Sequence, residues 1–250
     1  KLNENFNLMM EKLQIQQDKL LMTERHSAWE NVARKLAHEI KNPLTPIQLS
    51  IDRIREKYLK KIDDKNSDFS NYLNTINKQI QDIEHLVNEF SDFARMPKPV
   101  LKKIELSNVV SRSISLHELS EPGIKFIFSK NKVITNINGD EEQLNRVFIN
   151  LIKNSIESIH EKKSKNADFK GKIDVDIRSD SDYIYVTIID NGVGFKHIDK
   201  RKMLTPYFTT KKEGTGLGLA VVTKVVNDHN GVSMFDSISN GAKVEIRLPK

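Results

Sequence analysis

The chain has 250 residues, of which 38% are hydrophobic and 30% charged, and it carries a formal net charge of +6. These proportions are typical of a folded protein with one large or two modest domains, and not of a disordered chain. It contains no cysteine, which excludes disulfides and thiolate metal sites. The lysines are scattered beside acidic residues along predicted helices, and no segment combines clustered arginine with aromatics. We therefore predict no nucleic-acid partner.

Neither a membrane span nor a signal peptide is visible. No apolar run approaches the about 20 residues that a spanning helix needs. The chain starts at Lys1 in the middle of a helical pattern. We therefore expect a piece of a longer protein, attached to a membrane only through segments outside this chain.

The first hundred residues predict long helices in three parts. Over 1–28 an apolar residue recurs every seventh position, which predicts a weak coiled-coil seam. Between 33 and 58 the apolar spacing alternates between three and four, which predicts one buried stripe along a helix. Pro43 and Pro46 within that stripe predict a bend. A second amphipathic helix with the same spacing follows from 69 to 93.

A hairpin of two amphipathic helices leaves much of its apolar stripe in water. Pairing with a second copy as a four-helix bundle would cover that stripe. We therefore predict a homodimer through the helical hairpin. The run 96–99, Met-Pro-Lys-Pro, should end the second helix and form a stiff linker that serves as a hinge.

Beyond the linker, strand and helix patterns alternate. Strands are expected at 124–128, 132–136, 173–178, 183–189, 232–235 and 242–248, and helices at 141–159 and 217–228. Asp140 is the expected cap of the first of these helices. The pattern predicts an α+β fold, in which helices cover one face of a mixed or antiparallel sheet.

His38 is the first candidate for chemistry. It lies off the apolar stripe, with Glu39 beside it and Asn42 one helical turn further on. A neutral imidazole can attack phosphorus, and a neighbouring carboxylate can take its proton as the bond forms. An off-stripe histidine is most often simply solvated, and the adjacent carboxylate is what favours a chemical role here.

Two asparagines, Asn150 and Asn154, share one face of the helix expected at 141–159. A neutral amide oxygen can coordinate Mg²⁺ without adding a negative charge beside phosphates. The ordinary alternative is a polar helix face. It is weakened because Asn150 stands among large apolar residues, where a half-buried amide needs partners.

Two glycine-rich stretches follow, at 190–194 and 214–219. Asp190 ends a predicted strand, and its carboxylate could accept a hydrogen bond from an exocyclic amine such as that of adenine. The second stretch precedes a helix, whose N-terminal amides bind phosphate. It is neither a P-loop nor a Rossmann fingerprint. The segment between them, with Tyr-Phe-Thr-Thr-Lys at 207–211, suits a mobile loop over a bound nucleotide.

Taken in order, these motifs resemble the five boxes of bacterial two-component sensor histidine kinases. Residues 38–45 resemble the H box, 150–157 the N box, 190–194 the G1 box, 206–211 the F box and 214–219 the G2 box. The Leu-Thr-Pro-Ile run at 44–47 further resembles the NtrY/NtrB nitrogen-regulation branch, NtrY most of all.

The resemblance implies an all-α helical hairpin that forms a dimeric four-helix bundle, followed by an α+β two-layer sandwich of the gyrase/MutL/histidine-kinase ATPase type. It implies a signalling helix at 1–28, a dimerisation and histidine phosphotransfer domain at 29–96, and a catalytic ATP-binding domain at 97–250. It also implies ATP and Mg²⁺, a response-regulator receiver domain as partner, and a cytoplasmic location beneath an inner-membrane sensor.

The resemblance also implies residue roles. His38 would be the phosphoacceptor and Glu39 its base, and Asn42 would position water when the kinase dephosphorylates its partner. The nucleotide site would comprise Asn150, Lys153, Asn154, Asp190, Gly192, Gly194, Phe208, Thr209, Thr210, Lys211, Gly214, Thr215, Gly216, Leu217 and Gly218. Asn154 would hold Mg²⁺.

One position departs from the family pattern. Many members carry lysine or arginine three residues after the Mg²⁺ asparagine, where this chain has Glu157. Another cation, Lys153 or Lys211, would then serve the phosphates.

We therefore expect Mg²⁺·ATP-dependent autophosphorylation of His38 and phosphoryl transfer to an aspartate of a response regulator. One alternative is a gyrase- or MutL-type ATPase clamp, against which the His38-Glu39 pair argues. The other is a signalling scaffold that binds nucleotide weakly or not at all, against which the intact nucleotide motifs argue.

Overall fold

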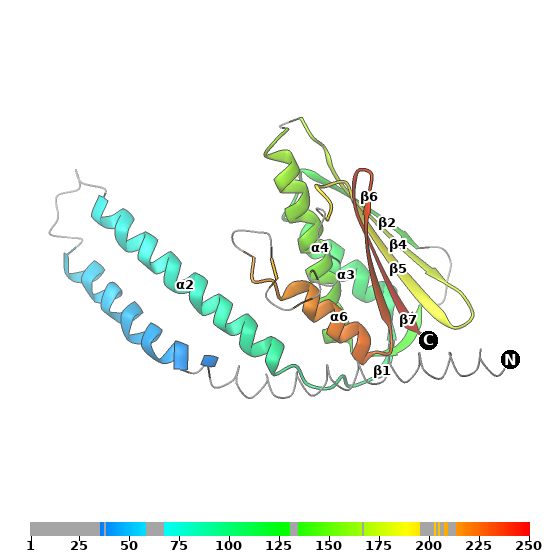
Figure 1. The fold of residues 1–250 in the computed structure, drawn as a ribbon, viewed down its shortest axis with the longest axis horizontal. Coiled ribbons are helices and arrows are strands. Elements are labelled where there is room, and N and C mark those ends of the chain that lie inside the picture. The colour runs from blue at the N-terminus through cyan, green and yellow to red at the C-terminus, as the bar shows by residue number, and fades with distance from the viewer. Residues whose placement is uncertain are drawn as a thin grey trace, which may run out of the picture. The chain divides into compact units, whose positions relative to one another are not determined.

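The computed structural model describes residues 36, 37, 39–58, 68–130, 135–166, 168–195, 203, 205, 208, 209 and 214–250. The chain divides into two compact units, Lys1–Met96 and Pro97–Lys250, and each is described by itself (Figure 1). Within the described ranges, no helix combines the length and the apolar character that a membrane crossing requires. The predicted seam at 1–28 and the candidate phosphoacceptor His38 lie outside the described residues.

Two helices lie among the described residues of the first unit. Residues 39–58 are helical, and Pro43 and Pro46 lie inside this segment without interrupting it. The bend predicted there stays a prediction. The second helix, α2, spans Asp68–Ala94 and matches the helix predicted at 69–93. The two helices share a small core, and its members are Ile51, Leu73 and Ile80 with Leu44 and Phe69 packed against them.

Only part of each apolar stripe is covered within the hairpin. Large apolar side chains remain 39–66% exposed on both helices, namely Leu36, Ile40, Ile47, Ile54 and Tyr58 on the first and Tyr72, Ile76, Ile83 and Leu86 on α2. Contiguous exposed apolar rows are uncommon on soluble monomers and are typical of interaction surfaces.

The second unit is built on a five-stranded sheet in the order β2-β4-β5-β7-β6. These strands are β2 (Ile124–Lys130), β4 (Gly171–Ser179), β5 (Tyr183–Asp190), β6 (Val232–Ile238) and β7 (Gly241–Pro249). The β2–β4 pair is parallel and the other three pairs are antiparallel. A separate short pair joins β1 (Lys102–Glu105) to β3 (Asn136–Gly139).

Three helices cover one face of this sheet: α3 (Leu106–Glu118), α4 (Glu141–Lys163) and α6 (Gly218–Asp228) (Figure 1). Alternate strand residues such as Ile173, Ile184 and Ile246 are fully buried beneath them, as are Phe148 and Ile152 of α4. The mixed sheet with helices on one face confirms the α+β fold that the sequence predicts.

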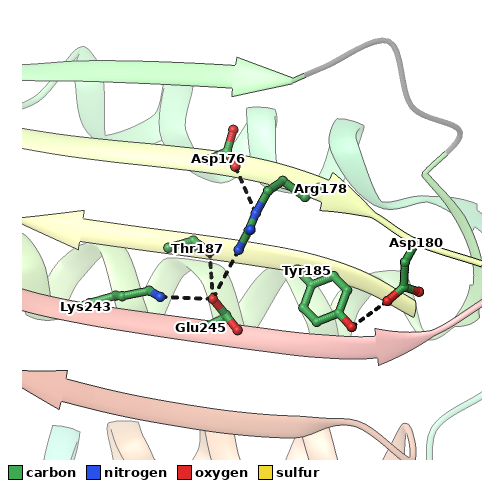
Figure 2. Close-up of polar contacts among 7 residues, drawn as sticks. All are labelled: Asp176, Arg178, Asp180, Tyr185, Thr187, Lys243 and Glu245. Carbon is green, nitrogen blue, oxygen red and sulfur yellow. Dashed lines mark hydrogen bonds and ion pairs between the residues drawn. The ribbon is translucent and has the colours of Figure 1, made fainter. Parts of the chain in front are cut away.

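The opposite face of the sheet carries a polar lattice that links three strands (Figure 2). The Arg178 guanidinium lies 3.5 Å from Asp176 and 3.3 Å from Glu245, and Lys243 lies 3.1 Å from the same glutamate. Thr187 donates its hydroxyl to Glu245 at 3.3 Å. This face is charged and can stay in water, whereas the other face is apolar and must be buried. The helices therefore pack on the apolar face alone.

The first part of the second unit differs from the sequence prediction. A strand is predicted at 132–136, whereas β3 begins at Asn136 and 131–134 lie outside the described residues. Neither β1 nor α3 is predicted. Helix α3 begins at Leu106, and Glu105 at its N-cap position makes no side-chain capping bond. The helix is rich in serine and valine, which are weak helix formers. Its packing on α4 and β2 outweighs that propensity.

Candidate functional site

The asparagine face of α4 points at the start of α6. Both Asn150 and Asn154 are half-buried. The Asn150 amide nitrogen donates to the Arg146 carbonyl at 2.9 Å, so its Oδ1 is turned away from that carbonyl. A Cβ placed on Gly218 would lie 3.5 Å from Asn150 Oδ1 and 3.8 Å from Asn154 Nδ2. The fold thus brings together two motifs that lie more than sixty residues apart in the sequence.

The N-terminus of α6 carries backbone donors but no capping side chain. Just before it, Leu217 N donates to the Thr215 hydroxyl at 3.3 Å, and Gly216 has a positive φ of 69°. Gly214, Thr215 and Gly216 are half-buried and Leu217 is buried. Free amides at a helix N-terminus favour an anion, whereas amide oxygens favour a hard cation. The adjoining parts of α4 and α6 therefore offer both kinds of group that a metal–phosphate site needs.

The amide oxygens on this face of α4 suit Mg²⁺ as ligands. Amide oxygens are acceptable ligands for this hard cation, which binds through few protein groups when phosphates supply the rest. The described residues contain no cluster of three or more histidine or acidic side chains that could hold a metal ion.

Asp190 ends β5 and is 5% exposed. Burial raises the pKa of its carboxyl, against the opposing effect of hydrogen bonds from the Gly192 amide, the Ser155 hydroxyl and the Ala242 amide. The Gly192 amide donates to Asp190 Oδ1 at 2.9 Å. A buried carboxylate of this kind is a strong and selective acceptor for an amine group.

The turn after Asp190 packs directly on α4. A Cβ on Gly192 would lie 2.2 Å from Ser158 Oγ and 2.6 Å from the Ser158 carbonyl carbon, so only glycine fits. Gly194 has a φ of +69°, and a Cβ there would lie 2.5 Å from the Gly241 carbonyl oxygen. The Val193 amide donates to Ser158 Oγ at 3.0 Å.

Sequence reasoning missed Ser155, Ser158 and Gly241. The spacing of Asn150, Asn154 and Ser158, each four residues apart, was a signal that could have placed the serine on the asparagine face. For Gly241, which contacts Asp190 across the β5–β7 pair, the sequence carries no such signal.

The remaining candidates are dispersed. Phe208 is half-buried, with its amide donating to Thr205 O at 3.2 Å, and Thr209 is exposed. Thr210 and Lys211 lie outside the described residues. Lys153 is exposed on α4. Burial lowers the pKa of His117 on α3, the charge of Glu121 opposes this, and the charge of Lys153 adds to the lowering. The assignment of Lys153 to the nucleotide site stays a prediction.

On the first helical unit, Glu39 and Asn42 are exposed on the helix of residues 39–58. Their neighbour His38 lies outside the described residues, so its own surroundings stay an expectation from the sequence. A phosphoacceptor needs a reachable position, and the exposure of both flanking candidates suits one.

Two family models match the chain. Residues 28–99 match the His Kinase A (phospho-acceptor) domain, and residues 139–250 match the histidine kinase-, DNA gyrase B- and HSP90-like ATPase. The second unit is therefore an ATPase domain of that group. The chain, with both domains in this order, belongs to the sensor histidine kinase family.

Curated relatives place it beside NtrY-like kinases. It is 39% identical to an NtrY-like sensor histidine kinase of Rickettsia felis over 97% of this chain and 40% of that protein. It is 36% identical to the nitrogen regulation protein NtrY of Azorhizobium caulinodans over 92% of this chain and 29% of that protein. The chain thus spans well under half the length of these relatives.

A solved structure shares both the fold and the domain order. Histidine kinase ThkA, in complex with response regulator protein TrrA, is 25% identical, with a TM-score of 0.64 over 91% of this chain and 63% of that one. The phospho-acceptor match argues against the gyrase-type clamp that the nucleotide motifs alone would allow.

Proposed function

We propose that this chain is the catalytic core of a sensor histidine kinase that phosphorylates His38 from Mg²⁺·ATP and passes the phosphoryl group to an aspartate of a response regulator. One observation carries the proposal. The amide face of α4, the uncapped start of α6 and the buried Asp190 converge in one unit of a chain whose residues 28–99 match a phospho-acceptor domain.

The nucleotide would span this convergence. Asp190 would accept a hydrogen bond from the adenine amine, and the first amides of α6 would bind phosphate. Mg²⁺, held by the Asn154 amide oxygen with Asn150 near the phosphates, would neutralise phosphate charge. The loop carrying Phe208 and Thr209, together with Gly214, would cover the site.

The proposed reaction transfers one phosphoryl group in two steps, first from ATP to a ring nitrogen of His38 and then to a carboxylate oxygen of the response regulator. The neutral His38 ring nitrogen bonds to the γ-phosphorus as the bond from that phosphorus to the bridging oxygen breaks, and ADP leaves. Glu39 takes the proton from the ring. The response-regulator carboxylate then bonds to the same phosphorus and the P–N bond breaks. The leaving ring nitrogen takes back the proton from the Glu39 carboxyl, which regenerates the neutral imidazole and the glutamate carboxylate.

The linker arrangement indicates where the ATPase unit would pivot. The Gln143 side-chain amide donates to Pro97 O at 2.9 Å, and the Val100 amide donates to Asp140 Oδ2 at 2.9 Å. Both contacts hold the linker against the start of α4. We infer that residues from Pro97 onward move with the ATPase unit and that the hinge lies before Pro97, within the broader 96–99 run that the sequence indicates.

The exposed apolar rows of the helical unit support a homodimer. A second copy would cover the side chains of α2 such as Ile76 and Ile83, which are 45% and 41% exposed. We further propose that the full-length protein is a membrane-anchored sensor whose cytoplasmic part includes this chain, since its relatives are more than twice as long.

The direct test is transfer of label from γ-labelled ATP. Wild-type protein should gain acid-labile label and pass it to a receiver domain, and His38→Gln should gain none. Label that survives this substitution contradicts the assignment of His38. Steady ATP hydrolysis without any phosphohistidine would instead favour the clamp alternative.

A further inference from the structure

One lysine in the last turn of α4 holds the turn that follows Asp190. The Lys162 ammonium donates to Asn191 O at 2.7 Å, to Gly192 O at 3.0 Å and to Asn240 Oδ1 at 2.5 Å. It also lies 4.8 Å from the centre of the Phe169 ring. All three of its donors are therefore used, and all three serve the surroundings of this turn.

Lys162 acts together with Ser158, which lies one helical turn earlier on the same face of α4. Ser158 Oγ accepts from Val193 N at 3.0 Å and donates to Asp190 Oδ1 at 3.5 Å. Between them, the two side chains contact four consecutive residues, 190 to 193. The turn is thus bound residue by residue to the helix that also carries the asparagines.

The neighbouring Asn191 side chain could not take over from Lys162 here. The Asn191 side chain is already committed, because Oδ1 accepts from Lys172 N at 2.8 Å and Nδ2 donates to Lys170 O at 2.9 Å. The carbonyls of Asn191 and Gly192 both point at one ammonium, and without it two like dipoles would face each other at the negative end of α4. The turn would then relax away from the helix.

On the far side, Lys162 reaches the turn between β6 and β7 through Asn240. That turn also contacts the Asp190 main chain, since a Cβ on Gly241 would lie 1.8 Å from Asp190 O. The lysine therefore joins the two segments that flank the Asp190 carboxylate.

We propose that Lys162 is a positioning residue that fixes the Asp190 turn and thereby sets the preference of the pocket for an adenine base. This inference rests on the proposed nucleotide site. Lys162 does not touch the base: it holds the carboxylate where an amine at the six position of a purine can donate to it. A purine with a carbonyl at that position offers no donor and is rejected.

The test compares binding of ADP and IDP, which differ at that position, by calorimetric titration of the full chain. Wild type should prefer ADP. In Lys162→Met, which keeps the apolar stem and loses the donors, ADP should bind about tenfold more weakly while IDP changes little, so the preference shrinks. Lys162→Arg should restore most of it.

The matched control is Lys165→Met. Lys165 follows α4 by two residues, and its ammonium lies 3.2 Å from the Glu161 carboxylate on the exposed surface. The substitution therefore removes the same charge as Lys162→Met without removing a contact to the turn. Its ADP and IDP affinities should equal those of wild type. Equal losses in Lys162→Met and Lys165→Met would overturn the inference, as would a Lys162→Met variant that loses ADP and IDP affinity in the same proportion.

A second variant covers the case in which Lys162→Met fails to fold. Ser158→Ala removes the bond to Val193 and should also shrink the ADP preference, whereas an unchanged preference would overturn the inference. Failure of wild type to bind either nucleotide would contradict the proposed function itself. The two failures are therefore distinguishable.

Discussion

The two units of the chain differ in how completely each buries its own apolar surface. In the ATPase unit, the apolar sides of the sheet and of three helices face one another, and the exposed sheet face is a paired lattice of charges. In the helical unit, a small core around Ile51 and Leu73 leaves rows of isoleucine and leucine in contact with solvent. The ATPase unit therefore buries its own apolar surface, whereas the helical unit leaves apolar rows that the homodimer we propose would cover.

The largest effect is expected from a substitution that disrupts the close packing of the Asp190 turn in the ATPase unit. Gly192→Ala should lower ADP affinity at least about a hundredfold, because its Cβ would overlap Ser158 main-chain atoms and the turn would have to move. Calorimetric titration measures it. The control is Gly123→Ala, whose Cβ would meet only the end of the flexible Lys163 side chain at 3.3 Å. Equal binding by both variants would contradict the packing argument.

Asp190→Asn should separate binding from stability. ADP binding should fall about a hundredfold as the acceptor charge is lost. Because burial raises the pKa of Asp190, the folded state binds a proton more readily than the unfolded state. Stability therefore falls as pH rises above the ordinary carboxyl pKa and stays reduced at neutral pH, so the variant should melt at the same or a higher temperature than wild type. A lower melting temperature at neutral pH would show that the charge stabilises the fold.

A second test of the contrast between the units introduces charge into the exposed apolar row of α2. Ile76→Glu with Ile83→Glu should weaken self-association about a hundredfold or more, since each buried isoleucine contributes about 1.5–3 kcal/mol. Sedimentation velocity measures the shift to monomer. ADP affinity should not change, because the nucleotide site lies wholly in the other unit. Gln79→Glu adds charge at an exposed polar position of the same helix and should leave the association state as it is.

A smaller effect is expected at the start of α4. The Asp140 side chain accepts from the amides of Glu142, Gln143 and Val100, so Asp140→Ala removes a helix cap and a linker contact together. The loss should be about 1–2 kcal/mol, seen as a melting temperature lower by about 2–8 °C. Glu142→Ala, at an exposed first-turn position, is the control. An equal fall in both variants would mean that the capping bonds contribute little.

The pH dependence of Asp140 has the opposite sign to that of Asp190. Burial acts to raise the pKa of Asp140, but the hydrogen bonds from the Val100, Gln143 and Glu142 amides outweigh it and hold the pKa below its ordinary value. Its stabilisation is therefore present above the ordinary carboxyl pKa and is lost as pH falls through the lowered value.

Much of the architecture could be predicted because its signals are local. The apolar spacing predicted α2 to within a residue at each end, and Asp140 was correctly predicted as the cap of α4. Strand alternation located β4 and β5 because buried and exposed faces follow a period of two. Helix α3 was not predicted, because many of its residues are weak helix formers, although Leu106, Val109 and Val110 have helical spacing.

For the candidate site, the sequence predicted which residue types take part, but it did not predict how they are arranged in space. Asn150, Asp190 and Gly218 were each identified from local motifs. Their partners in the fold, Ser158 and Lys162, were missed. Ser158 shares the four-residue spacing of the two asparagines, but Lys162 carries no such signal, because a lysine near a helix end is ordinary until a distant turn is placed against it.

The sequence by itself determined most of the elements and the types of chemical group: a histidine beside a carboxylate, a pair of amides, an acid at the end of a strand and glycines before a helix. These depend on spacing within one element, where the chain's own geometry sets which side chains share a face. Only the tertiary structure decided that the start of α6 faces Asn150 and Asn154, and that Lys162 ties the turn at Asn191 to α4. Such contacts join residues thirty to seventy positions apart, and their energies depend on how sheet and helices pack.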